Sequence, residues 1–149
     1  MKVVILDSTP LGYLSNSKPG PTALLCQQWA TDLAAAGCRL LVPEVADYEV
    51  RRELALQERT RSVKLLDSLA IQFEYLPMHT PAFRKAAELW VDARRRGRPT
   101  DDPHALDGDV LLAAQALTLA VAGPVVVATG NPAHLSRYVA AELWSAVGP

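Results

Sequence analysis

Four short stretches of the chain carry acidic or amide side chains at places where they could act together. Asp7 directly follows an apolar run, and Glu49 lies a few residues after a second apolar run. Asp109, with Asp107 two residues before it, precedes the small-residue stretch LLAAQALTLA. Asn131 follows a third apolar run, in the turn TGN. If these segments meet in space, they gather a set of oxygen-bearing side chains.

An all-oxygen set of this kind predicts a site for a divalent cation. Carboxylates brought together without lysine or arginine repel one another, and each raises its neighbours' pKa. A cation removes that cost, and oxygen ligands favour Mg²⁺ or Mn²⁺ over zinc. Such an ion polarises a phosphodiester and activates water. We therefore expect phosphoryl chemistry with Asp7, Glu49 and Asp109 as catalytic residues, and these three with Asn131 and Asp107 as metal ligands.

Each of these residues has a plainer interpretation when it is taken alone. Asp7 could cap a turn or helix, and the acids at 107 and 109 would favour a helix N-terminus electrostatically. Glu49 and Glu53 are four residues apart, as in a solvated helix stripe, and either fits the position of the second acid. Asn131 is a common turn residue. A shared site is indicated only because a suitable acidic or amide residue occurs in all four segments.

The elements that must position these residues follow from the hydrophobic pattern. Short apolar runs without alternation predict buried strands, and segments with apolar residues at helical spacing predict helices between them. The expected strands are 3–6, 39–42, 71–76 and 125–128, with a last edge strand in the tail, and the expected helices are 22–36, 44–58, 61–70, 81–96, 103–120 and part of 132–144. Asp102 is the expected N-cap of the helix that begins at Pro103. Buried strands alternating with helices predict an α/β fold with a central parallel sheet of four to five strands and helices on both faces. The carboxyl ends of such strands gather ligands, which is where Asp7 and Asn131 lie.

Length and composition are typical of one globular unit. The chain has 149 residues, 50% of them hydrophobic and 21% charged, and we expect one domain over 1–149. Cys26 and Cys38 have no metal-type spacing and are expected to be reduced. The opening MKVVILDSTP contains too few consecutive apolar residues for the core of a signal peptide. No apolar run approaches the about 20 residues that a membrane-spanning helix needs. We expect a cytoplasmic protein without membrane contact.

The net charge of −1 means that a polyanion must be met by a local patch. The densest basic run contains Arg94, Arg95, Arg96 and Arg98, which we expect to bind RNA phosphates. The alternative is a solvated helix end whose charges complement the helix dipole. A second, looser group of basic residues lies between 51 and 64. The three histidines are scattered, and we assign none of them a catalytic role.

Four segments together resemble the PIN-domain family, including VapC-type toxins. VVILDSTPLGYL is similar to the family's first strand and acid at Asp7, and LVPEVADYEVRREL to its second motif, mapping best onto Glu49. LDGDVLLAAQAL is similar to the third-acid helix at Asp109, and VVVATGNPAHL to the last motif, with Asn131 where many relatives carry a carboxylate. The resemblance implies a PIN-like three-layer α/β/α fold and a metal-dependent ribonuclease. For VapC-type members it also implies a small antitoxin partner and a homodimer.

Two other functions compete with a ribonuclease. Asp7 after the first strand also resembles haloacid-dehalogenase-like phosphatases, but Thr9 stands where a second acid is needed, and no lysine occurs between 86 and 149. A degenerate PIN domain that binds RNA or a partner without catalysis is the stronger alternative. We expect a metal-dependent endoribonuclease that hydrolyses RNA phosphodiester bonds with Mg²⁺ or Mn²⁺, in the setting of a toxin–antitoxin pair.

Overall fold

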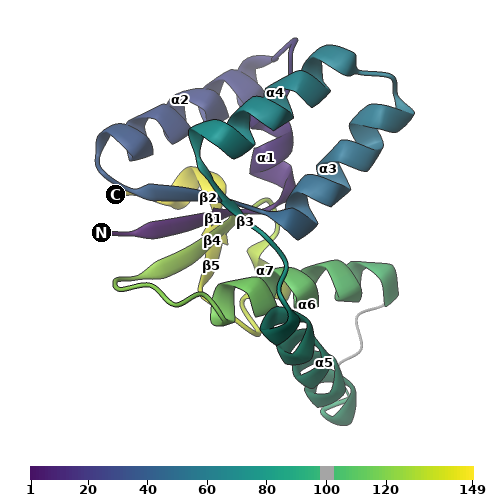
Figure 1. The fold of residues 1–149 in the computed structure, drawn as a ribbon. Coiled ribbons are helices and arrows are strands. Elements are labelled where there is room, and N and C mark those ends of the chain that lie inside the picture. The colour runs from purple at the N-terminus through teal and green to yellow at the C-terminus, as the bar shows by residue number, and fades with distance from the viewer. Residues whose placement is uncertain (98–102) are drawn as a thin grey trace.

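The computed structural model describes residues 1–97 and 103–149, with the side chains of 103–106 left out. Five strands alternate with helices along the chain (Figure 1). The elements are β1 (Val3–Leu6), α1 (Ser8–Leu14), α2 (Pro21–Ala35), β2 (Arg39–Pro43), α3 (Glu44–Leu56), α4 (Thr60–Gln72), β3 (Glu74–Leu76), α5 (Thr80–Arg95), α6 (Pro103–Leu117), β4 (Val125–Thr129), α7 (Pro132–Leu135), β5 (Ala141–Leu143) and the 3₁₀ helix η1 (Trp144–Ala146). No helix in the described ranges is long and apolar enough to span a membrane.

The five strands form one all-parallel sheet in the order β3-β2-β1-β4-β5. The two central strands, β1 and β4, pair over four residues, from Val3↔Val125 to Leu6↔Ala128. All four residues of β1 are buried, as expected for a parallel strand covered on both faces. This confirms the expected α/β class and the expected edge strand near the C-terminus.

Helices cover both faces of the sheet, which gives three layers (Figure 1). Successive strand residues point to opposite faces, so β1 contributes to two cores. Val4 and Leu6 pack with α1, α2 and α4 on one face, whereas Val3 and Ile5 pack with α6 on the other. The expected three-layer α/β/α arrangement is confirmed.

The first helix after β1 was not expected. Pro10 and Gly12 within α1 indicate a turn, and seven residues are too few to show a helical period. The helix forms because Asp7 caps it and because Pro10 lies in its first turn, where a missing N–H has no intrahelical partner.

The other differences concern the ends of elements. The strand expected over 71–76 is limited to Glu74–Leu76, because α4 continues to Gln72 and leaves Ile71 87% exposed. The tail helix is a single turn, α7, before β5. Asp102, the expected cap of α6, lies outside the described residues.

The C-terminal tail packs against α1 and α2 through aromatic contacts. The indole of Trp144 is 9% exposed and meets the rings of Tyr13 and Trp29 edge-on, at centroid distances of 5.9 and 5.6 Å. Trp29 Nε1 also donates to the Val147 carbonyl at 2.9 Å. These contacts close the core beside β4.

We predict that Trp144→Ala lowers the free energy of unfolding by about 3–5 kcal/mol, because it leaves a cavity among packed aromatic rings. Urea denaturation measures the loss. Leu143→Ala is the control, since Leu143 is 44% exposed and its truncation should cost less than about 1 kcal/mol. Equal losses in the two variants would contradict a core role for the tail.

Candidate active site

Asp7 lies at the carboxyl end of β1 and is held on both carboxylate oxygens. Oδ1 accepts from the Ser8 N–H at 2.7 Å, which caps α1. Oδ2 accepts from the Thr129 hydroxyl at 2.6 Å, from the end of the neighbouring strand β4. The side chain therefore has a fixed direction before any ligand arrives.

Glu49 reaches the same edge of the sheet from α3. Burial raises the pKa of its carboxyl, and the negative charges of Asp7 and Asp109 raise it further, whereas Arg52 acts in the opposite direction. Gly108 on α6 allows this approach, because a Cβ there would lie 3.3 Å from Glu49 Oε1. The glycine therefore brings α6 close to the Glu49 carboxylate.

Asp109 completes the group from α6, with its side chain 25% exposed. Burial raises its pKa, and the charge of Asp7 adds to the effect, while His134 and Arg137 lower it. Asp7 therefore disfavours the ionised forms of both Glu49 and Asp109. Three elements that are distant in sequence bring their acids within electrostatic reach of one another.

His134 is a residue of this site that the sequence analysis did not assign. Its Nδ1 lies 3.6 Å from Asp109 Oδ2. It belongs to α7, the single turn that follows β4. Its position three residues after Asn131, at the carboxyl end of a buried strand, was the signal that could have found it.

Asn131 is connected to the site through its backbone. Its N–H donates to Thr129 Oγ1 at 3.1 Å, and the same hydroxyl donates to Asp7. Its side chain is exposed and makes no capping bond to α7. The structure therefore places Asn131 at the rim of the site.

The remaining candidate acids lie apart from the three carboxylates. Asp107 is exposed and lines an apolar groove between α5 and α6, beside Trp90 and Val91. Glu53 is exposed on α3. Of the two candidates for the second acid, Glu49 is the one within electrostatic reach of Asp7 and Asp109.

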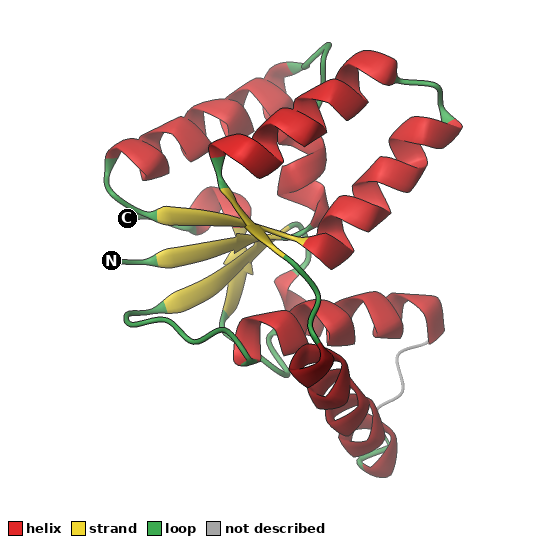
Figure 2. Cartoon of the chain, in the orientation of Figure 1, coloured by secondary structure: helices red, strands yellow, loops and turns green. Residues whose placement is uncertain are grey.

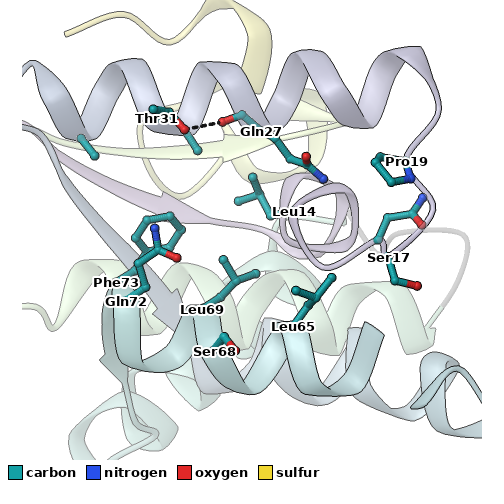
Figure 3. Close-up of a pocket in the computed structure, with 13 residues that line it drawn as sticks. Leu14, Ser17, Pro19, Gln27, Thr31, Leu65, Ser68, Leu69, Gln72 and Phe73 are labelled. Atoms are coloured by element: carbon teal, nitrogen blue, oxygen red, sulfur yellow. Dashed lines mark hydrogen bonds between the residues drawn. The ribbon is translucent and has the colours of Figure 1, made fainter. Parts of the chain in front are cut away.

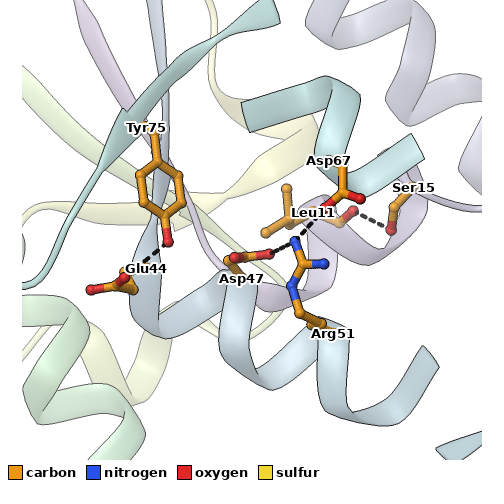
Figure 4. Close-up of polar contacts among 7 residues, drawn as sticks. All are labelled: Leu11, Ser15, Glu44, Asp47, Arg51, Asp67 and Tyr75. Atoms are coloured by element: carbon orange, nitrogen blue, oxygen red, sulfur yellow. Dashed lines mark hydrogen bonds and ion pairs between the residues drawn. The ribbon is translucent and has the colours of Figure 1, made fainter. Parts of the chain in front are cut away.

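Two other acids on α3 have structural partners (Figure 4). Glu44 accepts from the Met78 N–H at 2.9 Å and from the Tyr75 hydroxyl at 3.1 Å. Asp47 is paired with Arg51 at 3.0 Å, and Arg51 also reaches Asp67 on α4 at 2.9 Å. These bonds hold α3 against β3 and α4, and so determine where Glu49 lies.

The donor set suits a hard divalent cation in its chemistry. All three acids offer oxygen. Burial and the negative charge of Asp7 raise the pKa values of Glu49 and Asp109, and a cation would offset both effects by favouring the ionised carboxylates. Within the described part of the chain, however, no three carboxylate, imidazole or thiol groups form a ready-made cage. Binding would require side-chain rotation toward a common point.

Three of the expected RNA-binding arginines, Arg94, Arg95 and Arg96, lie at the C-terminal end of α5, the end remote from the sheet (Figure 2). The Arg94 guanidinium lies 4.1 Å from the centre of the Trp90 ring, and Arg96 pairs with Asp92 at 3.2 Å. Arg95 is exposed, and Arg98 lies outside the described residues. Their contact with RNA stays a prediction.

A separate apolar groove of about 480 Å³ runs between α2 and α4 (Figure 3). Its apolar lining comes from α1, from α4 and from the residue that caps α4: Leu14, Leu65, Leu69 and Phe73. None of the three carboxylates lines it. The groove is therefore a surface distinct from the candidate active site.

We predict that Glu49→Gln and Asp109→Asn each raise the free energy of unfolding at pH 7 in metal-free buffer. An acid whose pKa is raised by folding destabilises the native state increasingly as the pH rises from its unfolded pKa, about 4, through its folded value. Removing the ionisable group removes this loss.

The gain should disappear below about pH 4, where both states are protonated. Urea denaturation across pH 3.5–7 measures it. Glu53→Gln, on the exposed side of the same helix, should change stability by less than about 0.5 kcal/mol at any pH. A pH-independent gain in the site variants would contradict the raised pKa values as the cause.

No family model matches the chain, and no curated protein sequence matches it. Solved structures do match over nearly the whole length. VapBC2 from Rickettsia felis, bound to a DNA fragment from its promoter, has a TM-score of 0.68 at 15% identity, covering 94% of this chain and 97% of that chain.

Two further structures agree with this result. VapBC-1 from nontypeable Haemophilus influenzae has a TM-score of 0.68 at 18% identity, covering 96% of this chain and 98% of that chain. DNA-bound VapBC from Salmonella typhimurium has a TM-score of 0.62 at 17% identity, covering 97% and 99%. With its five-stranded parallel sheet and helices on both faces, the chain has the fold of a VapC-type PIN domain.

Proposed function

We propose that the chain is a metal-dependent endoribonuclease that hydrolyses RNA phosphodiester bonds. The observation that carries this proposal is the convergence of Asp7, Glu49 and Asp109 from β1, α3 and α6, where Asp7 raises the pKa values of Glu49 and Asp109, and Asp109 also raises that of Glu49. Arg52 offsets part of this effect at Glu49, as His134 and Arg137 do at Asp109, but the pKa values of both acids stay raised. In this cluster Glu49 and Asp109 are partly buried, and the negative charge of Asp7 acts on both of them.

The residues around the acids would support hydrolysis in specific ways. Asp7, Glu49 and Asp109 would hold Mg²⁺ or Mn²⁺, which polarises a phosphodiester and makes water nucleophilic. The Thr129 hydroxyl fixes the direction of Asp7, and Arg52 favours the ionised form of Glu49. Asn131 offers a neutral amide oxygen at the rim, and His134 lies against Asp109.

We predict that the purified protein cleaves RNA with Mg²⁺ or Mn²⁺ and that EDTA stops the reaction. Asp7→Asn and Asp109→Asn should each reduce the cleavage rate at least about 100-fold, because metal binding contributes several kcal/mol to transition-state stabilisation. Gel-based cleavage of labelled RNA measures the rate. Glu142→Gln, an exposed change on β5, should cut like the parent.

The same experiment distinguishes a nuclease from the main alternative, a degenerate domain that only binds RNA. Such a domain would bind RNA in a metal-containing buffer without cleaving it. If both Asp variants cut as fast as the parent, the activity does not belong to this site.

We further propose that the chain pairs with a small partner protein, as a toxin does with its antitoxin. The support is the similarity to three VapBC structures and the apolar groove between α2 and α4, which would suit an apolar segment of such a partner. The same similarity supports assembly as a homodimer.

A variant pair on α4 tests the groove. Leu65 lines the groove and is 38% exposed, whereas Ile71 lies outside its lining and is 87% exposed. We predict that Leu65→Asp abolishes co-purification with the protein encoded next to this chain's gene, and that Ile71→Asp does not. Loss in both variants, or in neither, would contradict this location.

A further inference from the structure

A polar hollow of about 350 Å³ lies beside the three carboxylates, between α1 and α3. Ser8 and Thr9, the two residues after Asp7, form part of its wall, and Glu49 lies on the side shared with the candidate active site. Arg52 and Arg59 also line it. The hollow therefore shares Glu49 with the site and differs from it by including two arginines in its lining.

Local structure sets the position of both arginines. Arg52 lies three residues after Glu49, on the same side of α3, with its guanidinium 5.2 Å from the centre of the Tyr48 ring. Arg59 follows Glu58, whose φ of 55° is left-handed and rare for a residue with a side chain. The N–H of Arg59 donates to the Leu54 carbonyl at 2.9 Å, which closes the end of α3.

Neither arginine forms a salt bridge with a carboxylate among the residues that the structure describes, although Arg52 lies close enough to Glu49 to lower the pKa of that acid. Arg51, next to Arg52, differs in this respect, because it bridges Asp47 and Asp67. The two guanidinium groups line one hollow together with Ser8 and Thr9, and they form a set of donors for an anion. Phosphate oxygens match such donors in charge and geometry.

We propose that this hollow binds the phosphate group next to the scissile one in an RNA strand, with Arg52 and Arg59 as its cationic contacts. The inference rests on the proposed ribonuclease function. Glu49 and Glu53 at the same hollow would repel a free anion. A phosphate within an RNA strand differs, because binding of the adjacent scissile phosphate at the carboxylate site brings it to the hollow. A cation bound to Glu49 would remove part of the repulsion.

Binding to a short single-stranded RNA, measured by fluorescence anisotropy in Mg²⁺, tests this assignment. The reference protein carries Asp7→Asn, so that the RNA is not consumed. Adding Arg52→Gln and Arg59→Gln should weaken binding about tenfold and lower the slope of log Kd against log salt by about 0.7, the change expected for the loss of one phosphate contact. Arg59→Gln alone should remove about half of that slope, without changing the environment of Glu49.

The matched control is Lys18→Gln with Arg84→Gln in the same background. These exposed cations lie on the α1–α2 connection and on α5, and they remove the same charge without lining the hollow. They should keep the reference affinity within about twofold. Equal losses in the two pairs would show a general charge effect and overturn the proposal, as would unchanged binding by the Arg52 and Arg59 variants.

Cleavage assays distinguish this inference from the proposed function. If the protein with Asp7 intact binds RNA through Arg52 and Arg59 but does not cut it, the hollow is confirmed and the nuclease function is wrong. If it cuts RNA and the arginine pair changes neither binding nor cleavage at low RNA concentration, the hollow is wrong and the nuclease function stands. If the reference protein binds no RNA at all, both are wrong.

Discussion

The parallel pairing of β1 with β4 is the constraint on which the site depends. The pairing runs to Leu6↔Ala128, so that the residues that follow, Asp7 after β1 and Thr129 at the end of β4, lie side by side. The hydroxyl of Thr129 then donates to Asp7, and Asn131 donates to that hydroxyl in turn. Two buried apolar strands therefore place a polar hydrogen-bond chain at the edge of the sheet.

The carboxylates at this edge repel one another, and the rest of the fold must supply the stability that this repulsion costs. Burial and the negative charge of Asp7 raise the pKa values of Glu49 and Asp109. The core on both sides of the sheet holds these groups in place regardless of this cost, because α3 and α6 are positioned by apolar contacts elsewhere. Stored like-charge repulsion of this kind is typical of functional sites, where a ligand of opposite charge relieves it.

Helix α3 shows how one element divides its acids between two tasks. Glu44 and Asp47 point to β3 and to Arg51, where hydrogen bonds and ion pairs hold them. Glu49 lies on a different side of the helix, toward α6, and Arg52 follows it by about one turn. The helical repeat separates the structural acids from the candidate catalytic one, so that changes on one side need not disturb the other.

Strong local signals were sufficient to predict the most regular elements. Buried runs such as Val3–Leu6 and Val125–Thr129 predicted parallel strands, and the acids that follow or precede such runs predicted a common edge. Helix α1 was missed because Pro10 and Gly12 carry the local signature of a turn, which the Asp7 cap and the core contacts of Leu11 and Leu14 override.

The contacts between polar residues on different elements could not be predicted from local signals. Glu49 and Glu53 are indistinguishable in local pattern, and the close approach of Gly108 to Glu49 depends on how α6 crosses α3. The same holds for His134 beside Asp109, and for Arg51, which is paired, next to Arg52, which is not. Hydrophobic periodicity records which face of an element is buried, but polar contacts between elements depend on their packing geometry, which the local pattern does not contain.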